Sequence, residues 1–262
     1  MEFFRKNFPG RCFTLYPLGD THVGSKQYNE AFFKQVIDEI AHNDQAYWMG
    51  MGDFMENALM GSRSDVYTQT MPPTEQANYI GDMLEPIKKK GLFMITGNHE
   101  QRTMRVAGFV PEQYISNRLG LPYLGFSAFA LFVVNEKKHG NTFVCYFHHS
   151  FGGGYTQGGK INRAEQLRKI APTADAIFSG HSHTTARIPI TWFDVLRTGL
   201  VTRIGYDYIT GSALEYKGSY AEERGKPAAA LEFIKVTFRG GTNGHWDSRE
   251  QIYEIIVPKK DA

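Results

Sequence analysis

Residues 92–100 read Leu-Phe-Met-Ile-Thr-Gly-Asn-His-Glu, and the fold is organised around this stretch. Leu92–Ile95 is an apolar run of the length of a β-strand, and the run stops at Gly97. The next three residues, Asn-His-Glu, have polar side chains that can bind a metal or carry a proton. The stretch therefore predicts a strand that delivers chemical groups to the edge of a sheet.

The same construction, an apolar run followed by glycine and then by a residue able to bind metal, occurs three more times. Phe13–Leu18 leads to Asp20 and His22, Tyr47–Met51 leads to Asp53, and Ala176–Phe178 leads to His181 and His183. Glycine suits a tight exit from a strand because its backbone tolerates positive φ and close approach to a ligand. In open sheets with parallel strands, ligands gather at the carboxyl ends of the strands, so we expect all four exits to meet at one centre in an α/β fold.

Each of these residues alone has a simpler structural explanation. Gly52-Asp53 in isolation is most often a turn, and a lone histidine is more often structural than a ligand. The pairs Asp20/His22 and His181/His183 are harder to dismiss, because a spacing of two places both side chains on one face of an extended segment. The four exits together favour a shared site over a set of unrelated turns.

The composition limits the class of protein. A chain of 262 residues with 42% apolar content can bury a sizeable core, as one large α/β domain or as two small ones. The formal charge of +2 is too small to indicate nucleic-acid binding by itself. Cys12 and Cys145 each lie in an apolar run and no Cys-x-x-Cys spacing occurs, so we expect free thiols.

No segment has the sequence features of a membrane span or of a secretory signal. No stretch reaches the roughly 18 uninterrupted apolar residues that a membrane span requires, so no membrane partner is expected. Met1–Arg11 mixes phenylalanine with basic residues and lacks a continuous apolar core. A cytoplasmic location is therefore the default expectation.

Apolar periodicity predicts helices and strands in the intervals between these sites. Helices are expected at 29–41, at 74–90 with Pro86 either kinking or ending the helix, at 110–119 and at 160–170. Strands are expected at 123–134 and 142–147, and then at 188–193, 201–209, 231–238 and 252–257. This distribution predicts two sheets packed face to face and flanked by helices.

Two loops are expected to border the site. His148-His149-Ser150 ends the strand at 142–147, and Gly152–Gly154 with Gly158-Gly159 makes a flexible loop whose backbone could approach a phosphate. The residue order of a Walker loop is missing from it. The long segment 54–73 leaves directly from Asp53, and loops that leave a site often set substrate choice.

The set of motifs resembles the calcineurin-like metallophosphoesterase family, whose five blocks occur here in the family's order between residues 20 and 183. The blocks are Asp20-x-His22, Gly52-Asp53, Gly97-Asn98-His99-Glu100, a histidine at 148 or 149, and Gly180-His181-x-His183. The resemblance implies an α/β fold in the form of a four-layer α/β/β/α sandwich with two mixed β-sheets, made by residues 1–262 as a single domain. It also implies two divalent metal ions.

The resemblance implies a role for each block. Asp20, His22, Asp53 and His183 would hold the first metal, and Asp53 would bridge to a second metal completed by Asn98, His181 and either His148 or His149. Many members have His-x-Pro at the tandem histidines, which would select His148, whereas others have His-Gly-x-Gly-Gly-Gly, which selects His149 and is the alignment we favour. Oxygen and imidazole ligands without thiolate suit Mn²⁺, Fe or Zn²⁺.

By the same resemblance, the chain is expected to be a phosphodiesterase that acts on nucleotides or on nucleic acid, DNA or RNA. Two metals roughly 3.5–4 Å apart can share a hydroxide that attacks phosphorus. His99 would stabilise the transition state or protonate the leaving oxygen, Glu100 could fix the tautomer of His99, and Arg102 could contact substrate.

Two alternatives remain open at this stage. Gly97 to Arg102 is close to the Gly-Asn-His-Glu-Ser-Arg of phosphoprotein phosphatases, which suggests a phosphomonoesterase. The second block of that group contains an arginine that is missing here, where Glu56-Asn57 occupies the position. A non-catalytic scaffold with the same fold is the other alternative, although scaffold relatives tend to lose ligands that this chain retains.

Overall fold

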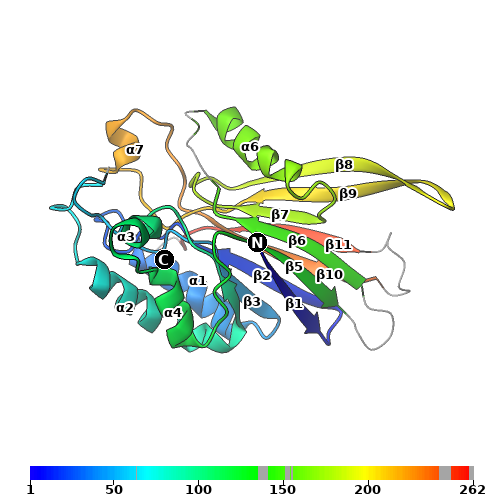
Figure 1. Ribbon diagram of the computed structural model, residues 1–262, viewed down its shortest axis with the longest axis horizontal. Helices are drawn as coiled ribbons and strands as arrows, with labels where there is room; N and C mark the ends of the chain where they lie inside the picture. Colours follow the sequence, from blue (N-terminus) through cyan, green and yellow to red (C-terminus); the bar gives the residue numbers. More distant parts are fainter. Residues whose placement is uncertain (63, 135–140, 151–153, 155, 242–248, 260–262) are drawn as a thin grey trace.

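The computed structural model describes residues 1–62, 64–134, 141–150, 154, 156–241 and 249–259, and two mixed β-sheets form its centre (Figure 1). The five-stranded sheet has the order β11 (Glu250–Ile256), β10 (Phe233–Arg239), β2 (Cys12–Leu18), β3 (Ala46–Gly50) and β4 (Gly91–Met94). The six-stranded sheet has the order β1 (Glu2–Phe8), β5 (Ser127–Val134), β6 (Asn141–His148), β7 (Ala176–Ser179), β9 (Gly199–Ile209) and β8 (Ala186–Leu196). In each sheet, the strands that lead to the site run parallel to one another.

The inner faces of the two sheets enclose the main hydrophobic core, which is rich in phenylalanine. Phe13 of β2 stacks on Phe8 of β1 with ring centroids 3.8 Å apart, and it also stacks on Phe238 of β10 at 5.1 Å. Phe147 of β6 stacks on Phe178 of β7 at 4.9 Å. Offset aromatic stacking adds to the stabilisation from burying these large side chains, so the two sheets are held rigidly face to face.

Helices cover the outer face of each sheet. The apolar side of α1 (Glu30–His42) packs with α2 (Pro73–Leu84) and α4 (Pro111–Leu119) against the five-stranded sheet. On the other side of the molecule, Ala164 of α6 (Gln157–Gln166) is buried, and Leu167 after its end packs with Tyr146 and Ile177 of the six-stranded sheet. The expected α/β/β/α sandwich with two mixed sheets is therefore confirmed (Figure 1).

The helix boundaries follow their local chemistry. Asn29 caps α1 by accepting a hydrogen bond from the Phe32 amide at 2.9 Å. The segment expected as one helix at 74–90 ends as an α-helix at Leu84 and continues as a 3₁₀ helix over Glu85–Lys90, because Pro86 lacks the amide proton that an α-helix needs.

Several elements differ from the expectation, among them β1, β5 and α3 (Glu100–Ala107). β1 was not expected, because Glu2–Phe8 mixes charged and aromatic residues, yet it pairs with β5 as an edge strand. β5 begins at Ser127 and not at 123, and α3 starts directly at the end of the Gly-Asn-His-Glu block.

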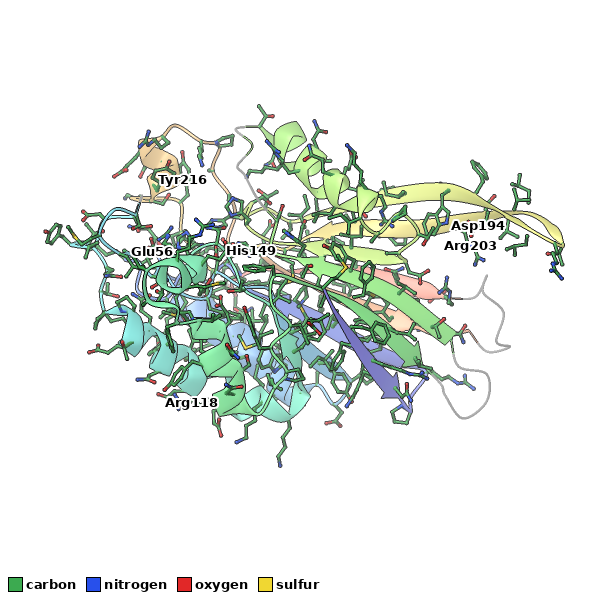
Figure 2. All side chains as sticks on the ribbon, in the orientation of Figure 1. Glu56, Arg118, His149, Asp194, Arg203 and Tyr216 are labelled. Atoms are coloured by element: carbon green, nitrogen blue, oxygen red, sulfur yellow. The ribbon has the colours of Figure 1, made fainter. Side chains whose placement is uncertain are left out.

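The hairpin of β8 and β9 extends beyond the body of the sandwich (Figure 1). The Asp194–Arg203 ion pair, with Oδ2 and Nε 3.0 Å apart, lies toward its outer end (Figure 2). The two cysteines are free, as expected. Within the described residues, no helix is both long enough and apolar enough to cross a membrane.

Candidate metal centre

The site lies where β2, β3, β4, β6 and β7 end, and its backbone is strained at five of the candidate ligands. Asp20, His22, Asp53, His181 and His183 all have positive φ, between 49° and 69°. This region is unfavourable for residues with a side chain and persists only where the surrounding structure enforces it. Residues with such backbone angles typically cluster at functional sites, so the strain indicates that these turns form a functional site together.

Two glycines allow the turns to approach the acidic side chains closely. A Cβ atom on Gly97 would lie 2.1 Å from Asp53 Oδ1, and one on Gly180 would lie 2.7 Å from Asp20 Oδ2. Both distances are shorter than non-bonded atoms allow. Glycine is therefore required at each position for the carboxylate and the neighbouring turn to share the same space.

One half of the cluster is formed by Asp20, His22 and His183. His22 Nε2 lies 3.0 Å from His183 Nε2, and Asp20 Oδ1 lies 3.3 Å from His183 Nε2 and 3.9 Å from His22 Nε2. Asp20 is fully buried, and no described residue donates a well-formed hydrogen bond to its Oδ1. The other oxygen, Oδ2, accepts a hydrogen bond from the His181 amide at 2.9 Å, which fixes the carboxylate.

The other half is formed by Asp53, Asn98, His149 and His181. His149 Nε2 lies 3.0 Å from Asp53 Oδ2 and 3.1 Å from the Asn98 side chain. The same end of the Asn98 amide lies 2.6 Å from His181 Nδ1 and 3.2 Å from Asp53 Oδ2. His149 Nδ1 lies 2.8 Å from the Met51 carbonyl oxygen, which must accept its proton, so Nε2 is the nitrogen directed toward the cluster.

This donor set fits divalent cations. The imidazole nitrogens and carboxylate oxygens of three groups lie within 4.8 Å of one another, namely Asp20/His22/His183, His22/Asp53/His99 and Asp53/His149/His181. His22 Nε2 and His183 Nε2 face each other at 3.0 Å, and an Asn98 oxygen directed at the cluster would meet only acceptors unless a cation were present. Nitrogen and oxygen ligands of this kind match Mn²⁺, Fe or Zn²⁺.

The electrostatics of the protein alone lead to the same conclusion. Burial acts to lower the pKa of His149, but the carboxylates of Asp53 and Asp20 raise it to about 10. Burial likewise acts to raise the pKa of Asp53, but the surrounding imidazoles hold it well below its usual range. The two buried carboxylates are thus stabilised by a positive charge beside them. Either a protonated histidine or a bound cation can supply that charge.

The tandem histidines point in different directions. His149 is 2% exposed and lies in the cluster, whereas His148 Nδ1 accepts a hydrogen bond from the Ser150 amide at 2.7 Å. His148 is the last residue of β6, and successive side chains of a strand point to opposite faces. Of the two candidates, the structure brings His149 and not His148 to the other candidate ligands.

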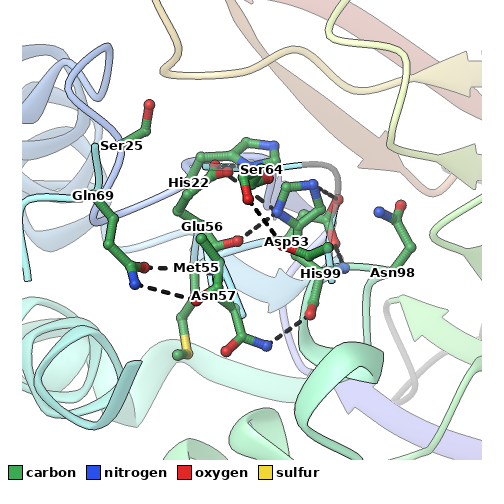
Figure 3. Close-up of polar contacts among 12 residues, drawn as sticks. His22, Ser25, Asp53, Met55, Glu56, Asn57, Ser64, Gln69, Asn98 and His99 are labelled. Carbon is green, nitrogen blue, oxygen red and sulfur yellow. Dashed lines mark hydrogen bonds and ion pairs between the residues drawn. The ribbon is translucent and has the colours of Figure 1, made fainter. Parts of the chain in front are cut away.

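His99 lies at the edge of the cluster, and its ring is oriented by a backbone group (Figure 3). Its Nδ1 lies 2.8 Å from the Glu56 carbonyl oxygen, which must accept the proton, and its Nε2 lies 4.0 Å from Asp53 Oδ2. The His99 amide donates to Asp53 Oδ1 at 2.8 Å. Burial lowers the pKa of His99 to about 3, so the free ring is neutral and its Nε2 is available toward the cavity.

Glu100 does not have the expected contact with His99. Its carboxylate is fully buried and accepts hydrogen bonds from the Asp53 amide at 3.0 Å and from the Met55 amide at 3.1 Å. The carbonyl of Glu56, and not Glu100, fixes the tautomer of His99. The reason is that α3 begins at Glu100 and turns its side chain beneath the Asp53 loop, where it shapes that loop.

Glu56 is a site residue whose contact the sequence did not reveal. Its Oε2 lies 3.2 Å from His22 Nδ1 (Figure 3). Burial acts to raise the pKa of Glu56, but hydrogen bonding to His22 and the charge of His22 lower it to about 2. The only local signal was a carboxylate three residues after Asp53, which does not by itself specify a partner.

The cluster opens into a cavity of about 680 Å³. Arg102 lines it, but its Nη1 donates to the carbonyl oxygen of Glu56 at 3.0 Å and to Ser64 Oγ at 3.0 Å. Further walls come from the long segment after Asp53, from α6 and from residues 214–229 around α7 (Tyr220–Glu223). Gly152 and Gly153 of the expected phosphate loop lie outside the described residues, while Gly154 lines the cavity.

Comparison with known proteins identifies one family. A family model described as calcineurin-like phosphoesterase matches residues 14–185. No curated protein matches significantly. Among solved structures, Vps29 complexed with Zn²⁺ from Entamoeba histolytica has a TM-score of 0.39 and 13% identity, covering 93% of this chain and 99% of that one. A conserved uncharacterized protein of Streptococcus pneumoniae, described as a predicted phosphoesterase, has a TM-score of 0.35 and 11% identity, covering 93% and 98%. Both scores are too low for either structure to inform the function of this chain.

Proposed function

Because the chain belongs to the calcineurin-like phosphoesterase family, we propose that it is a two-metal phosphodiesterase acting on the phosphodiester bonds of nucleotides or nucleic acid. The observation that carries this proposal is the convergence of two carboxylates, one amide and four imidazoles, whose possible ligand atoms lie close to one another. The adjoining cavity of about 680 Å³ has room for a substrate of nucleotide size.

In this proposal each half of the cluster would hold one divalent cation, and Asp53 would contribute to both halves. Asp20, His22 and His183 would hold the first cation, and Asn98, His149 and His181 would hold the second. When bound, the two ions supply a nucleophile from water at neutral pH and neutralise charge on the reacting phosphate. We expect Mn²⁺, with Fe or Zn²⁺ as the alternatives.

The residues of the chain supply orientation and proton transfer. The Met51 carbonyl holds the His149 ring, the Glu56 carboxylate holds the His22 ring, and the Glu56 carbonyl holds the His99 ring. His99 Nε2 then faces the cavity, where it can exchange a proton with the leaving oxygen of the substrate. Rings fixed in this way need no reorganisation during the reaction.

The charges beside His99 favour a diester over a monoester. A monoester dianion carries one more negative charge, for which planar arginine is the usual partner. Here the Glu56 carboxylate lines the cavity, and the Arg102 guanidinium already donates to the Glu56 carbonyl and to Ser64. The Arg102 guanidinium therefore has fewer N–H groups left to donate to the additional anionic oxygen of a monoester.

The test compares kcat/KM for bis-p-nitrophenyl phosphate and for p-nitrophenyl phosphate in the Mn²⁺-loaded protein. We expect the wild type and Arg102→Ala to prefer the diester, and chelation of the metal to abolish both activities. Arg105→Ala is the matched control, because Arg105 lies on the same helix as Arg102. Its Nη2 donates a hydrogen bond to Gln101 Oε1, and neither of these two residues lines the cavity.

Phosphomonoesterase activity is the second candidate, and the position of Arg102 in the cavity wall is the observation that favours it. A wild-type preference for the monoester of about tenfold or more, lost in Arg102→Ala and retained in Arg105→Ala, would replace the diesterase proposal with this one.

A further inference from the structure

A buried lysine lines the cavity next to the metal-binding turn. Lys160 on α6 is 9% exposed, and its Nζ donates to Thr184 Oγ1 at 2.6 Å. Thr184 directly follows the candidate ligand His183. Among the described residues, no carboxylate forms an ion pair with Lys160. An ammonium group held at a cavity wall without a carboxylate partner attracts an anion that enters the cavity.

A second lysine lines the same cavity from the segment that follows α7. Lys226 Nζ lies 5.1 Å from the centre of the Tyr220 ring. Its backbone is fixed, because Tyr216 Oη donates to the Lys226 carbonyl oxygen at 2.7 Å and the Lys226 amide donates to Ala221 O at 2.9 Å. The position of Lys226 is therefore set by the fold of residues 216–226.

The two lysines are close enough to repel each other. Burial, and after it the charge of Lys226, lower the pKa of Lys160. Lys160 lies on α6 and Lys226 follows α7, so the two lysines are far apart in the sequence. Both helices nevertheless lie on the same side of the molecule (Figure 1). Figure 2 places Tyr216 on that side, at the same end of the molecule as Glu56 and His149. Two like charges brought together at a cavity wall are stabilised when an anion binds between them.

We propose that Lys160 and Lys226 form an anion subsite that takes a second phosphate group of the substrate while the reacting phosphate lies at the metal centre. The inference rests on the phosphoesterase function proposed above and narrows its substrate class. The preferred substrate then carries at least two phosphates, as in an oligonucleotide or a nucleoside polyphosphate, and is not an isolated diester. Glu223 also lines the cavity, and its negative charge repels a phosphate. We therefore expect a phosphate to be attracted to the two lysines and not to the whole wall.

The direct test is binding of inert bisphosphonates to the metal-loaded protein by isothermal titration calorimetry. Alkane-α,ω-bisphosphonates with spacers of about two to eight carbons are compared with alkylphosphonates of the same length, since neither contains a bond that a phosphoesterase cleaves. At the spacer that fits, we expect the bisphosphonate to bind about tenfold more tightly than the monophosphonate.

The lysine variants assign this gain to the subsite. Lys160→Gln and Lys226→Gln should each remove it while leaving monophosphonate affinity within about twofold. Lys217→Gln is the matched control, because Lys217 is exposed, lies in the same segment as Lys226 and does not line the cavity. The absence of a gain at every spacer length, or an equal loss in Lys217→Gln, would overturn the subsite.

Hydrolysis experiments separate this inference from the proposed function. If bis-p-nitrophenyl phosphate is not cleaved but the lysine-dependent bisphosphonate gain persists, the diesterase proposal fails and the subsite stands. If the diester is cleaved and no bisphosphonate gain is seen, the subsite fails alone. Oligothymidylate and thymidine triphosphate are then compared as competitors of the bound bisphosphonate. The tighter competitor shows whether the second phosphate belongs to an oligonucleotide or to a nucleoside polyphosphate.

Discussion

Glu56 Oε2 lies 3.2 Å from His22 Nδ1, and this contact orients the imidazole from outside the metal centre. Because the pKa of Glu56 is lowered to about 2, the residue is a carboxylate at neutral pH and accepts the hydrogen bond, so Nδ1 must carry the proton. Nε2 is thereby the nitrogen directed toward Asp20 and His183, where it can bind a metal. A carboxylate behind a histidine in this way raises its basicity as a metal ligand.

Glu56→Gln should weaken metal binding without unfolding the protein. The amide oxygen can still accept the His22 proton, but the charge that increases the basicity of the imidazole is lost. Losses of about 10–100-fold in metal affinity are typical of such changes. Titration of the metal-free protein with Mn²⁺ measures this directly, and Glu223→Gln removes the same charge from another part of the cavity wall. Equal affinities in wild type and Glu56→Gln would mean that His22 does not bind metal.

Asp53→Asn should lower activity more than any other single ligand change. Asp53 lies between His22 of one half of the cluster and His149 and His181 of the other, so in the proposed two-metal centre its carboxylate would contact both ions. The substituted amide can still accept the His99 amide proton, which preserves the loop. We expect reduced content of both metals by elemental analysis, whereas Asp20→Asn should affect mainly one. Full occupancy with near-normal turnover in Asp53→Asn would exclude a shared ligand.

His99→Ala should leave metal content nearly intact and lower kcat. Proton transfer by a positioned side chain is typically worth about 10²–10⁴-fold, which sets the expected loss. Donation from Nε2 requires the doubly protonated ring, because the proton of Nδ1 is held by the Glu56 carbonyl. A nitrophenolate leaving group needs no proton and should therefore lose less rate than an alkoxide leaving group. Equal losses for both substrates would argue against proton donation.

The sequence predicted the sandwich and the convergence of the four strand exits because the signals for both are local. Each of the four strand exits combines an apolar run, a glycine and a polar residue within a few positions, and parallel strands bring such exits together. The choice between His148 and His149 could not be made locally, since it depends on which of two successive residues at the end of β6 points toward the cluster. A shift of one residue reverses the faces of a strand.

The contacts of Glu56 and Glu100 were missed for a different reason. Glu100 is adjacent to His99 in sequence, which suggested a contact, but the start of α3 directs its carboxylate beneath the Asp53 loop. Glu56 lies 34 positions from His22, and only the positive-φ turns bring the two together. Such contacts depend on side-chain direction in irregular backbone, which periodicity does not encode.

Glu112→Gln should make the protein more stable at high pH than the wild type. Glu112 is fully buried, accepts the Thr96 hydroxyl proton at 2.7 Å, and lies against Glu100. Burial, and after it the charge of Glu100, raise the pKa of Glu112 well above its usual range. Glu100 accepts two backbone amide protons, so Glu112 is the partner that carries the shared proton. Glutamine imitates the neutral charge of that protonated form, and its single oxygen can keep the hydrogen bond from either the Thr96 hydroxyl or the Gly97 amide.

The sign of the pH effect follows from the raised pKa. The stabilisation from protonated Glu112 is fully present below the unfolded-state pKa of about 4.5, and it is lost as the pH rises through the folded-state pKa. Urea unfolding from pH 5 to 9 should therefore show the wild type losing stability relative to Glu112→Gln. Glu100→Gln is the matched control and should be destabilised at every pH by ~1–3 kcal/mol, because one of the Asp53 and Met55 amides loses its acceptor. The reverse ranking would place the proton on Glu100 and leave Glu112 as the carboxylate.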